Sequence, residues 1–169
     1  MDLETAICTR RTHKAFAPEP VEPQLLDELL GLARWAPNHH LTNPWRFRVL
    51  GPQALARLKA VAGPEAAAKL DRAPTLVAVS AVRSEDPVQD EEDLLATGCA
   101  IYAVLLAAHA RGLAGYWRTP EVLRRPEGRA ALQIPDSERF VGLVHLGHPR
   151  QPREPPERLP LSCVMTLLA

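Results

Sequence analysis

The chain has 169 residues, 20 basic and 20 acidic side chains, and a formal net charge of zero. This length suits one domain with its own hydrophobic core, and 46% hydrophobic with 24% charged residues is the composition of an ordinary globular protein. The balanced charge argues against a nucleic-acid-binding protein, because such proteins normally carry a basic excess. It argues equally against a polyacidic disordered chain.

The composition is skewed in two ways, toward Arg over Lys and toward Pro over Asn. Of the 20 basic residues 17 are Arg and 3 are Lys, and the chain holds 17 Pro but only 2 Asn. Scarce Asn with many loop prolines is one route to heat resistance, and a GC-rich coding bias would give the same composition. Both explanations stay open, and neither bears on the reaction.

The sequence favours a reduced, cytoplasmic, soluble protein. Cys8, Cys99 and Cys163 are odd in number and lack CxxC spacing, so neither a disulfide framework nor a cysteine zinc site is indicated. The N-terminus lacks the basic-then-apolar order of a signal peptide. The 15 uncharged residues from Leu94 to Ala108 are fewer than a membrane-spanning helix needs.

The first half of the chain predicts helices before and after one strand. A short helix is expected over residues 2–9, and a second opens at Pro23 and runs to about Trp35 with a clean apolar stripe. A polar loop then leads to an alternating, half-buried strand over 45–50. Ala-rich helices are expected over 53–62 and 64–70.

The second half adds three strands. A β-branched apolar run predicts a buried strand over 75–82, followed by a helix over about 90–111 that Gly112 closes. Strands over 114–118 and 140–146 flank a short helix at 126–133, and the proline-rich stretch 148–160 should be extended. Strands interleaved with helices indicate an α+β or α/β sandwich, with one domain over 1–169 and a C-terminal arm over 148–169.

The long helix is apolar nearly all round, so it should be buried nearly all round. Either it is the central helix of a monomeric core, or a partner subunit covers it. The apolar ending LSCVMTLLA after the proline-rich extension favours the partner, because such a segment is a poor free tail and a good arm for a second subunit. We therefore predict a homodimer.

Three clusters offer binding chemistry, while the common nucleotide, metalloprotease and serine-hydrolase motifs are missing. The run Arg10-Arg11-Thr12-His13-Lys14 suits phosphate oxygens, or is a solvated basic turn. The loop 36–45 offers amides, imidazoles and an indole for a flat polar ring, or is a plain connection. The run 115–119 joins a glycine, aromatic rings and a cation. Together they suggest a planar anionic cofactor.

In order along nearly the whole chain, these segments resemble the FMN-dependent nitroreductase family, and its compact bacterial NAD(P)H members in particular. RRTHKAF resembles the family's N-terminal Arg-Arg-Ser motif, with Thr12 in place of Ser. ARWAPNHHLTNPWRFRVL resembles its Ala-Pro…Gln-Pro-Trp-x-Phe segment, with Asn43 in place of Gln. GYWRTP and FVGLVHLGHPR resemble its Gly-x-x-Trp-Arg-Ser turn and its closing strand with a Gly-x-Pro turn.

The resemblance implies a three-layer α+β sandwich, with a mainly antiparallel central sheet flanked by helices, in an intertwined homodimer. It implies that Arg10 and Thr12, assisted by Arg11, bind the FMN phosphate and ribityl chain, and that Lys14 lies near the pyrimidine end of the flavin. The other FMN-binding candidates that it implies are Trp35, Asn38, His39, Trp117, Arg118, Thr119 and Arg150. Compact members often have Arg at the position of Trp35. The replacement of that Arg by Trp35 removes a polar contact to the flavin.

The implied activity is that of an FMN oxidoreductase. It would take hydride from NADH or NADPH and reduce a nitroaromatic, quinone or similar small-molecule acceptor in ping-pong order. No protein side chain is assigned as catalytic and no metal is expected, because the chemistry belongs to the flavin. Two alternatives remain: reduction of another acceptor, such as an activated C=C bond or a halogenated compound, and a flavin-binding dimer without turnover.

Overall fold

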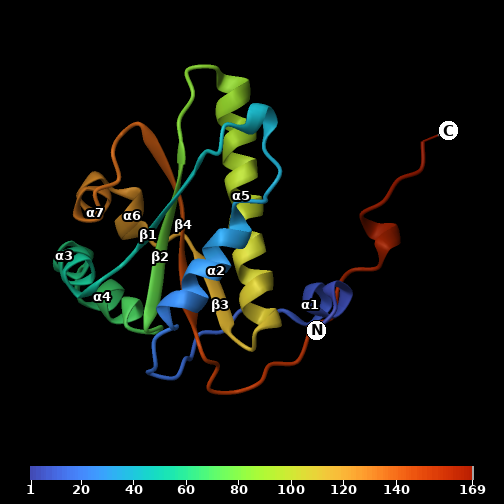
Figure 1. Cartoon of the computed structure of the whole chain (residues 1–169), viewed down its shortest axis with the longest axis horizontal. Coiled ribbons are helices and arrows are strands. Elements are labelled where there is room, and N and C mark those ends of the chain that lie inside the picture. Colours follow the sequence, from blue (N-terminus) through green and yellow to red (C-terminus); the bar gives the residue numbers. More distant parts are fainter. Residues whose placement is uncertain (169) are drawn as a thin grey trace.

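A four-stranded antiparallel sheet forms the centre of the computed structural model, which describes residues 1–168 (Figure 1). The strand order is β1–β2–β4–β3, with the two long strands in the middle. The sequence predicted all four strands, although β4 begins two residues earlier than expected. Their bounds are Trp45–Val49 for β1, Thr75–Val82 for β2, Ala114–Arg118 for β3 and Glu138–Gly147 for β4.

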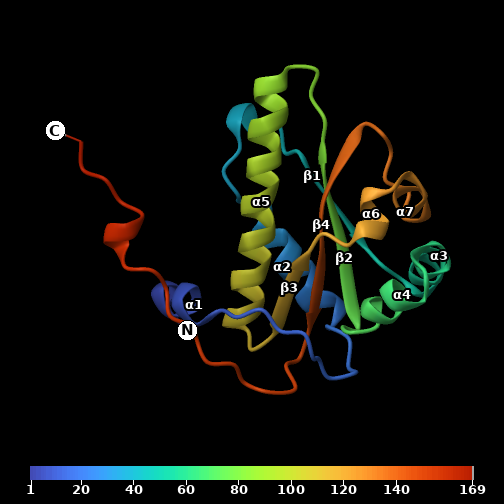
Figure 2. The same ribbon diagram turned by 180° about the vertical axis from the view of Figure 1, so that it is seen from behind.

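Helices cover both faces of this sheet, which confirms the α+β class (Figures 1 and 2). On one face lie α2 (Pro23–Ala33) and α5 (Pro87–Ala110). On the other lie α3 (Pro52–Ala62), α4 (Pro64–Leu70), α6 (Glu121–Arg124) and α7 (Pro126–Ala131). Each layer buries its own apolar cluster against the sheet. The sequence did not predict α6, because a four-residue helix is too short to show a period.

The ends of the helices follow the residues that signalled them. In α1 (Leu3–Thr9), Asp2 is the N-cap and accepts a hydrogen bond from the backbone N–H of Thr5 at 2.9 Å. Pro23 opens α2, where its missing N–H costs no hydrogen bond. Gly63 and Gly112 follow α3 and α5 with φ of 72° and 76°, a left-handed conformation that favours glycine.

Helix α5 is longer and less completely buried than predicted. It begins at Pro87 because Asp86 caps it, accepting from the backbone N–H of Val88 at 2.9 Å. One side packs against the sheet, but Leu95 is 64% exposed and Tyr102 is 39% exposed on the other. One chain therefore does not bury α5 on nearly all sides, although the sequence had predicted such burial for this helix. By length and by a mean hydropathy of 1.6, α5 is the one helix within residues 1–168 that could span a membrane. Half of its apolar stretch of 18 residues is buried inside the structure.

The C-terminal arm leaves the sheet after β4 and projects past α1 into solvent (Figures 1 and 2). It is extended as predicted, apart from a short 3₁₀ turn, η2 (Leu161–Cys163). Within residues 1–168 the large apolar side chains of the arm are left exposed, and Leu167 and Leu168 are 85% and 92% exposed. An apolar segment in this position is expected to bind something, because isolated exposure of so many large side chains is unfavourable in water.

Candidate functional site

The basic N-terminal segment lies along β3, which is an edge strand of the sheet. Thr12 forms a parallel bridge with Gly115, and the backbone N–H of His13 donates to the carbonyl oxygen of Gly115 at 3.3 Å. Further along, Phe16 forms an antiparallel bridge with Pro149, just after β4. These contacts fix residues 10–16 against the rigid sheet, so their side chains have defined positions.

A pocket of about 380 Å³ opens between this segment and the C-terminal arm. Arg10, Arg11 and Thr12 line one wall, and Arg153 and Arg158 of the arm line the other. Four guanidinium groups around one cavity, with Glu154 as its single acid, make a site that favours an anion. We call it the Arg10 pocket.

Arg10 and Arg11, two predicted residues of this pocket, have different roles. Arg11 is only 9% exposed, and its guanidinium donates to the carbonyl oxygens of Cys8 at 2.6 Å and Glu154 at 3.3 Å. It therefore ties the arm to the N-terminal segment. Arg10 lies 6.0 Å from the centre of the Tyr102 ring on α5 and makes no hydrogen bond to any side chain described in the structure. Of these two side chains, Arg10 is the one whose guanidinium is available to a ligand.

The surroundings of the Arg10 pocket keep two histidines neutral. Burial lowers the pKa of His109, and the charges of Arg10 and Arg11 lower it further. Burial likewise lowers the pKa of His13, with Arg153 and His109 adding to the effect. At neutral pH the positive charge of this region therefore comes from its arginines, which hold it at every physiological pH.

Lys14 and Arg150 come together in a second, neighbouring pocket of about 430 Å³. The backbone N–H of Arg150 donates to the carbonyl oxygen of Ala15 at 3.4 Å, which brings the end of β4 beside the basic segment. Arg72, at the end of α4, lines the same pocket. We call it the Lys14 pocket, and no residue that lines it also lines the Arg10 pocket.

The loop candidates lie elsewhere on the molecule. His39 bonds through Nδ1 to the carboxylate of Glu92 at 2.8 Å, near the start of α5. It lines a shallow pocket of about 400 Å³ together with Asn38, Leu95 and Cys99. Trp35, at the end of α2, is 82% exposed.

The backbone of this loop is strained. His40, Leu41 and Asn43 have φ of 53°, 52° and 47°, in the left-handed region that side chains other than glycine rarely adopt. The side-chain oxygen of Asn38 helps to hold the conformation by accepting from the backbone N–H of Asn43 at 2.9 Å. Strain of this kind clusters at binding sites, where it fixes a required shape.

The loop and the Arg10 pocket lie at opposite ends of α5 (Figure 1). His39 meets the helix at Glu92, whereas Thr9 meets it at His109, whose Nε2 lies 2.8 Å from the Thr9 hydroxyl. At 1.5 Å of rise per residue these two positions are about 25 Å apart. The structure therefore does not bring the two groups of predicted residues together within one chain.

The candidates at the end of β3 alternate between the two faces of the sheet, as strand residues must. Trp117 faces α5: its ring lies 3.7 Å from where a Cβ on Gly98 would be, and its Nε1–H donates to the carbonyl oxygen of Val141 at 3.3 Å. Arg118 faces the opposite side, where its Nη1 is buried without a partner within residues 1–168. Thr119 follows the strand and accepts from Arg124 at 2.9 Å. One ligand cannot contact the side chains of both Trp117 and Arg118 on the same face.

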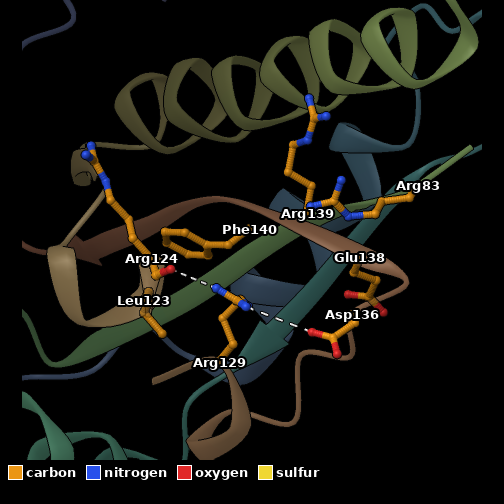
Figure 3. A pocket seen from close by; sticks show the side chains of 8 residues that line it. All are labelled: Arg83, Leu123, Arg124, Arg129, Asp136, Glu138, Arg139 and Phe140. Carbon is orange, nitrogen blue, oxygen red and sulfur yellow. Dashed lines mark hydrogen bonds and ion pairs between the residues drawn. The ribbon is translucent and has the colours of Figure 1, made fainter. Parts of the chain in front are cut away.

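A further pocket, of about 190 Å³, is lined by four arginines, but it is not a convergent anion site (Figure 3). Arg129 points between the Arg124 carbonyl oxygen and Asp136, whereas the side chain of Arg124 points away from it. Arg139 turns toward α5 and pairs with Asp90. The guanidinium groups diverge, so we assign this pocket to surface ion pairing.

Comparison with known proteins decides the family. The model of the nitroreductase family matches residues 7–69 and 58–148. The chain belongs to the nitroreductase family. An Escherichia coli K12 protein named "Putative NAD(P)H nitroreductase YdjA" is 31% identical over 88% of both chains. A Bacillus subtilis relative, "Putative NAD(P)H nitroreductase YfhC", is 26% identical over 94% of this chain and 90% of its own.

Solved structures confirm the nitroreductase fold. A nitroreductase-like family protein from Bacillus cereus superposes with a TM-score of 0.90 and 25% identity, covering 99% of this chain and 96% of its own. A Desulfovibrio desulfuricans nitroreductase crystallised with FMN superposes with a TM-score of 0.83 at 24% identity, covering 100% and 98% of the two chains. The resemblance read from the sequence motifs is thus confirmed at the level of family and fold.

Sequence reasoning missed three arginines that line the pockets of this nitroreductase-family chain. Arg153 and Arg158 belong to the arm, which was expected to serve a partner subunit and not the Arg10 pocket. Arg72 stands alone between a helix and a strand. The only available signal was that each is a basic residue in a loop, and many surface arginines share that feature.

Proposed function

We propose that this chain is an FMN-dependent oxidoreductase that takes hydride from NADH or NADPH and reduces a nitroaromatic, a quinone or a similar electron-poor acceptor in ping-pong order. The observation that carries the proposal is the Arg10 pocket, where the predicted basic segment lines a cavity rich in guanidinium groups. Family membership and the FMN in the Desulfovibrio desulfuricans relative support it.

The residues of the Arg10 pocket fit the phosphate of FMN. A phosphate monoester carries nearly two negative charges and several acceptor oxygens, and Arg10, Arg153 and Arg158 offer forked N–H donors that match them. The Thr12 hydroxyl adds a donor on the same wall. Bound FMN supplies hydride transfer, which no side chain in the pocket can perform. The task of the protein is therefore to bind and orient it.

We further propose that the protein is a homodimer with FMN at the subunit interface. The distance of about 25 Å along α5 is longer than one mononucleotide, so the Arg10 pocket and the His39 loop of one chain cannot hold the same FMN. Pairing two chains through the exposed side of α5 would bring the loop of one toward the pocket of the other. The exposed Leu95 and Tyr102 and the uncovered arm support this arrangement.

The absorption spectrum of the purified protein, before and after anaerobic NADH or NADPH, tests the proposal. We expect a flavin spectrum that one donor or both bleach, and that a nitroaromatic or quinone restores. A colourless protein that takes up no FMN would contradict the proposal. A bound flavin that neither donor bleaches would instead identify a binding protein without turnover.

Replacing Arg10 with Ala should weaken FMN binding at least tenfold. The variant loses one or two charge-assisted hydrogen bonds to phosphate, each contributing roughly 1.5–3 kcal/mol. Titration of the apoprotein with FMN, followed by flavin fluorescence, measures the change. Arg83→Ala removes the same charge from the pocket of Figure 3 and should leave FMN affinity as it is. Equal affinity of the wild type and Arg10→Ala would show that the basic segment is a solvated turn.

A further inference from the structure

His39 and Glu92 form a hydrogen-bonded pair at the shallow pocket near the start of α5, which we call the His39 pocket. The Nδ1 atom of His39 lies 2.8 Å from a carboxylate oxygen of Glu92. A carboxylate can only accept a hydrogen bond, so the imidazole carries a proton on Nδ1 and donates it. The other ring nitrogen, Nε2, bonds to nothing within residues 1–168. Nε2 is therefore the atom that can exchange a proton with a ligand.

The surroundings of His39 hold its ring in a defined position. The ring of His40 stacks on it, with the two centroids 3.8 Å apart and the planes inclined by 19°. A second hydrogen bond joins the same loop to α5, from the Thr42 hydroxyl to the Asp93 carboxylate at 2.5 Å. The position of the imidazole is thus set before any substrate binds, which is what a proton-transfer group requires.

The rest of the His39 pocket suits an uncharged aromatic ring. Pro37, Leu95 and Ala96 contribute apolar surface, and of the described residues that line the pocket Glu92 is the one acid. The volume of about 400 Å³ lies in the range of small-molecule sites. A quinone or a nitroaromatic that packs against this surface would share the cavity with the His39 imidazole.

Reduction of such an acceptor requires a proton as well as a hydride. A quinone takes up one hydride and one proton to give a hydroquinone. A nitro group takes up one of each and loses water to give a nitroso compound. The cofactor of the proposed function supplies the hydride, so the proton needs a source of its own. An imidazole is the side chain that most often has this role.

We propose that His39 is a catalytic residue that donates this proton from Nε2, and that Glu92 is its positioning residue. The Nε2–H bond breaks as an O–H bond forms on the acceptor, which leaves the imidazole neutral. The side chain of His39 is 58% exposed, so it regains a proton from solvent. The negative charge of Glu92 stabilises the protonated ring that each transfer requires.

This inference rests on the proposed function and the proposed dimer, which bring the loop of one chain toward the FMN of the other. It adds a side chain to a reaction for which the sequence indicated none. Asp93 is not assigned a part in the transfer, because its carboxylate already accepts from Thr42 and from the Gln89 amide at 3.0 Å.

The ratio of two turnover rates, each measured per bound flavin, tests the proposal. Benzoquinone takes up a hydride and a proton, whereas ferricyanide takes up electrons alone. We expect His39→Ala to lower the benzoquinone-to-ferricyanide ratio at least tenfold, because a positioned acid contributes about 10²- to 10⁴-fold and water replaces part of it. Glu92→Gln should lower the ratio less. His40→Asn is the matched control, since it removes the neighbouring imidazole and Asn tolerates a positive φ; its ratio should equal that of the wild type.

Two further measurements separate proton donation from a structural role. Added imidazole should restore benzoquinone reduction in His39→Ala and leave ferricyanide reduction as it is. Nitrogen-15 NMR of the histidine rings gives a readout without turnover: the signals missing from His39→Ala identify the residue. In the wild type the neutral ring should be protonated at Nδ1, and Glu92→Gln should shift that proton toward Nε2.

Equal ratios in the wild type and His39→Ala, or a parallel loss of both activities, would overturn the proposal. A neutral His39 ring protonated at Nε2 in the wild type would overturn it as well, because Glu92 would then not position the imidazole. Failure of the proposed function is recognised separately, by a wild-type protein without bound or reducible flavin.

Discussion

Deletion of residues 161–169 is expected to raise the dissociation constant of the proposed dimer at least 100-fold. The deleted segment includes large apolar side chains that one chain leaves exposed, among them Leu161, Val164 and Leu167. Burying such a side chain contributes about 1.5–3 kcal/mol, and a dimer has two arms. Even after the entropic cost of ordering them, the loss exceeds the 2.8 kcal/mol or so that a 100-fold change represents.

Sedimentation velocity over a dilution series measures this change, and FMN retention gives a second readout. We expect the deleted protein to lose FMN as it dissociates, since each site is proposed to use residues of both chains. Glu157→Gln, in the polar part of the arm, keeps the apolar ending and should dimerise like the wild type. A deleted protein that dimerises like the full chain would refute a role for the arm in assembly.

Acidification from pH 7 to pH 4 is expected to remove about 3 kcal/mol of folding free energy through His145 alone. This residue is fully buried on β4, and neither of its ring nitrogens has a partner within residues 1–168. Burial, together with the smaller effect of the Arg118 and Arg72 charges, lowers its pKa from 6.5 to about 4. The gap between the two values corresponds to about 3 kcal/mol.

The sign follows from where the proton binds. Well above pH 6.5 the imidazole is neutral in both the folded and the unfolded state, so it does not affect the free energy of unfolding. As the pH falls from 6.5 toward 4, the unfolded chain takes up a proton that the folded chain does not, so unfolding is increasingly favoured. Below about 4 the folded protein is protonated as well, and this effect stops growing.

Urea unfolding of the wild type and His145→Leu at pH 7 and pH 4.5 isolates the contribution. Leu fills similar space, and no hydrogen bond is lost, so the variant should be about as stable at pH 7. It should lose less stability on acidification. His148→Leu, at an exposed position, should follow the wild type. Carboxyl groups also make stability depend on pH, but they do so equally in both proteins. Identical pH dependence of the unfolding free energy in the wild type and His145→Leu would therefore contradict the expected pKa of His145.

The fold could be predicted from the sequence because its signals are local. Prolines and glycines such as Pro23 and Gly63 mark helix ends by their own backbone preferences, and the apolar run of β2 is legible in eight residues. The layers follow from burying these apolar faces against one another. The exposure of Leu95 on α5 did not follow, because composition cannot tell a face covered by the chain from one left open.

The candidate site could be predicted only in part. Arg10 and Thr12 are close in the sequence and line one pocket, as expected. The predicted group at Trp117 and Arg118 is divided between the two sheet faces, although strand alternation already implied this. Arg72 and Arg153 reach their pockets through long-range packing that no local pattern records.

The bridge between Thr12 and Gly115 has a consequence for solubility. The free amide and carbonyl groups of an uncovered edge strand can form hydrogen bonds with a strand of another molecule, and such pairing commonly initiates aggregation. The same N-terminal residues that line the Arg10 pocket also cover the edge of β3. Variants that loosen this segment should therefore precipitate on storage, so weak flavin content and poor shelf life would share one structural origin.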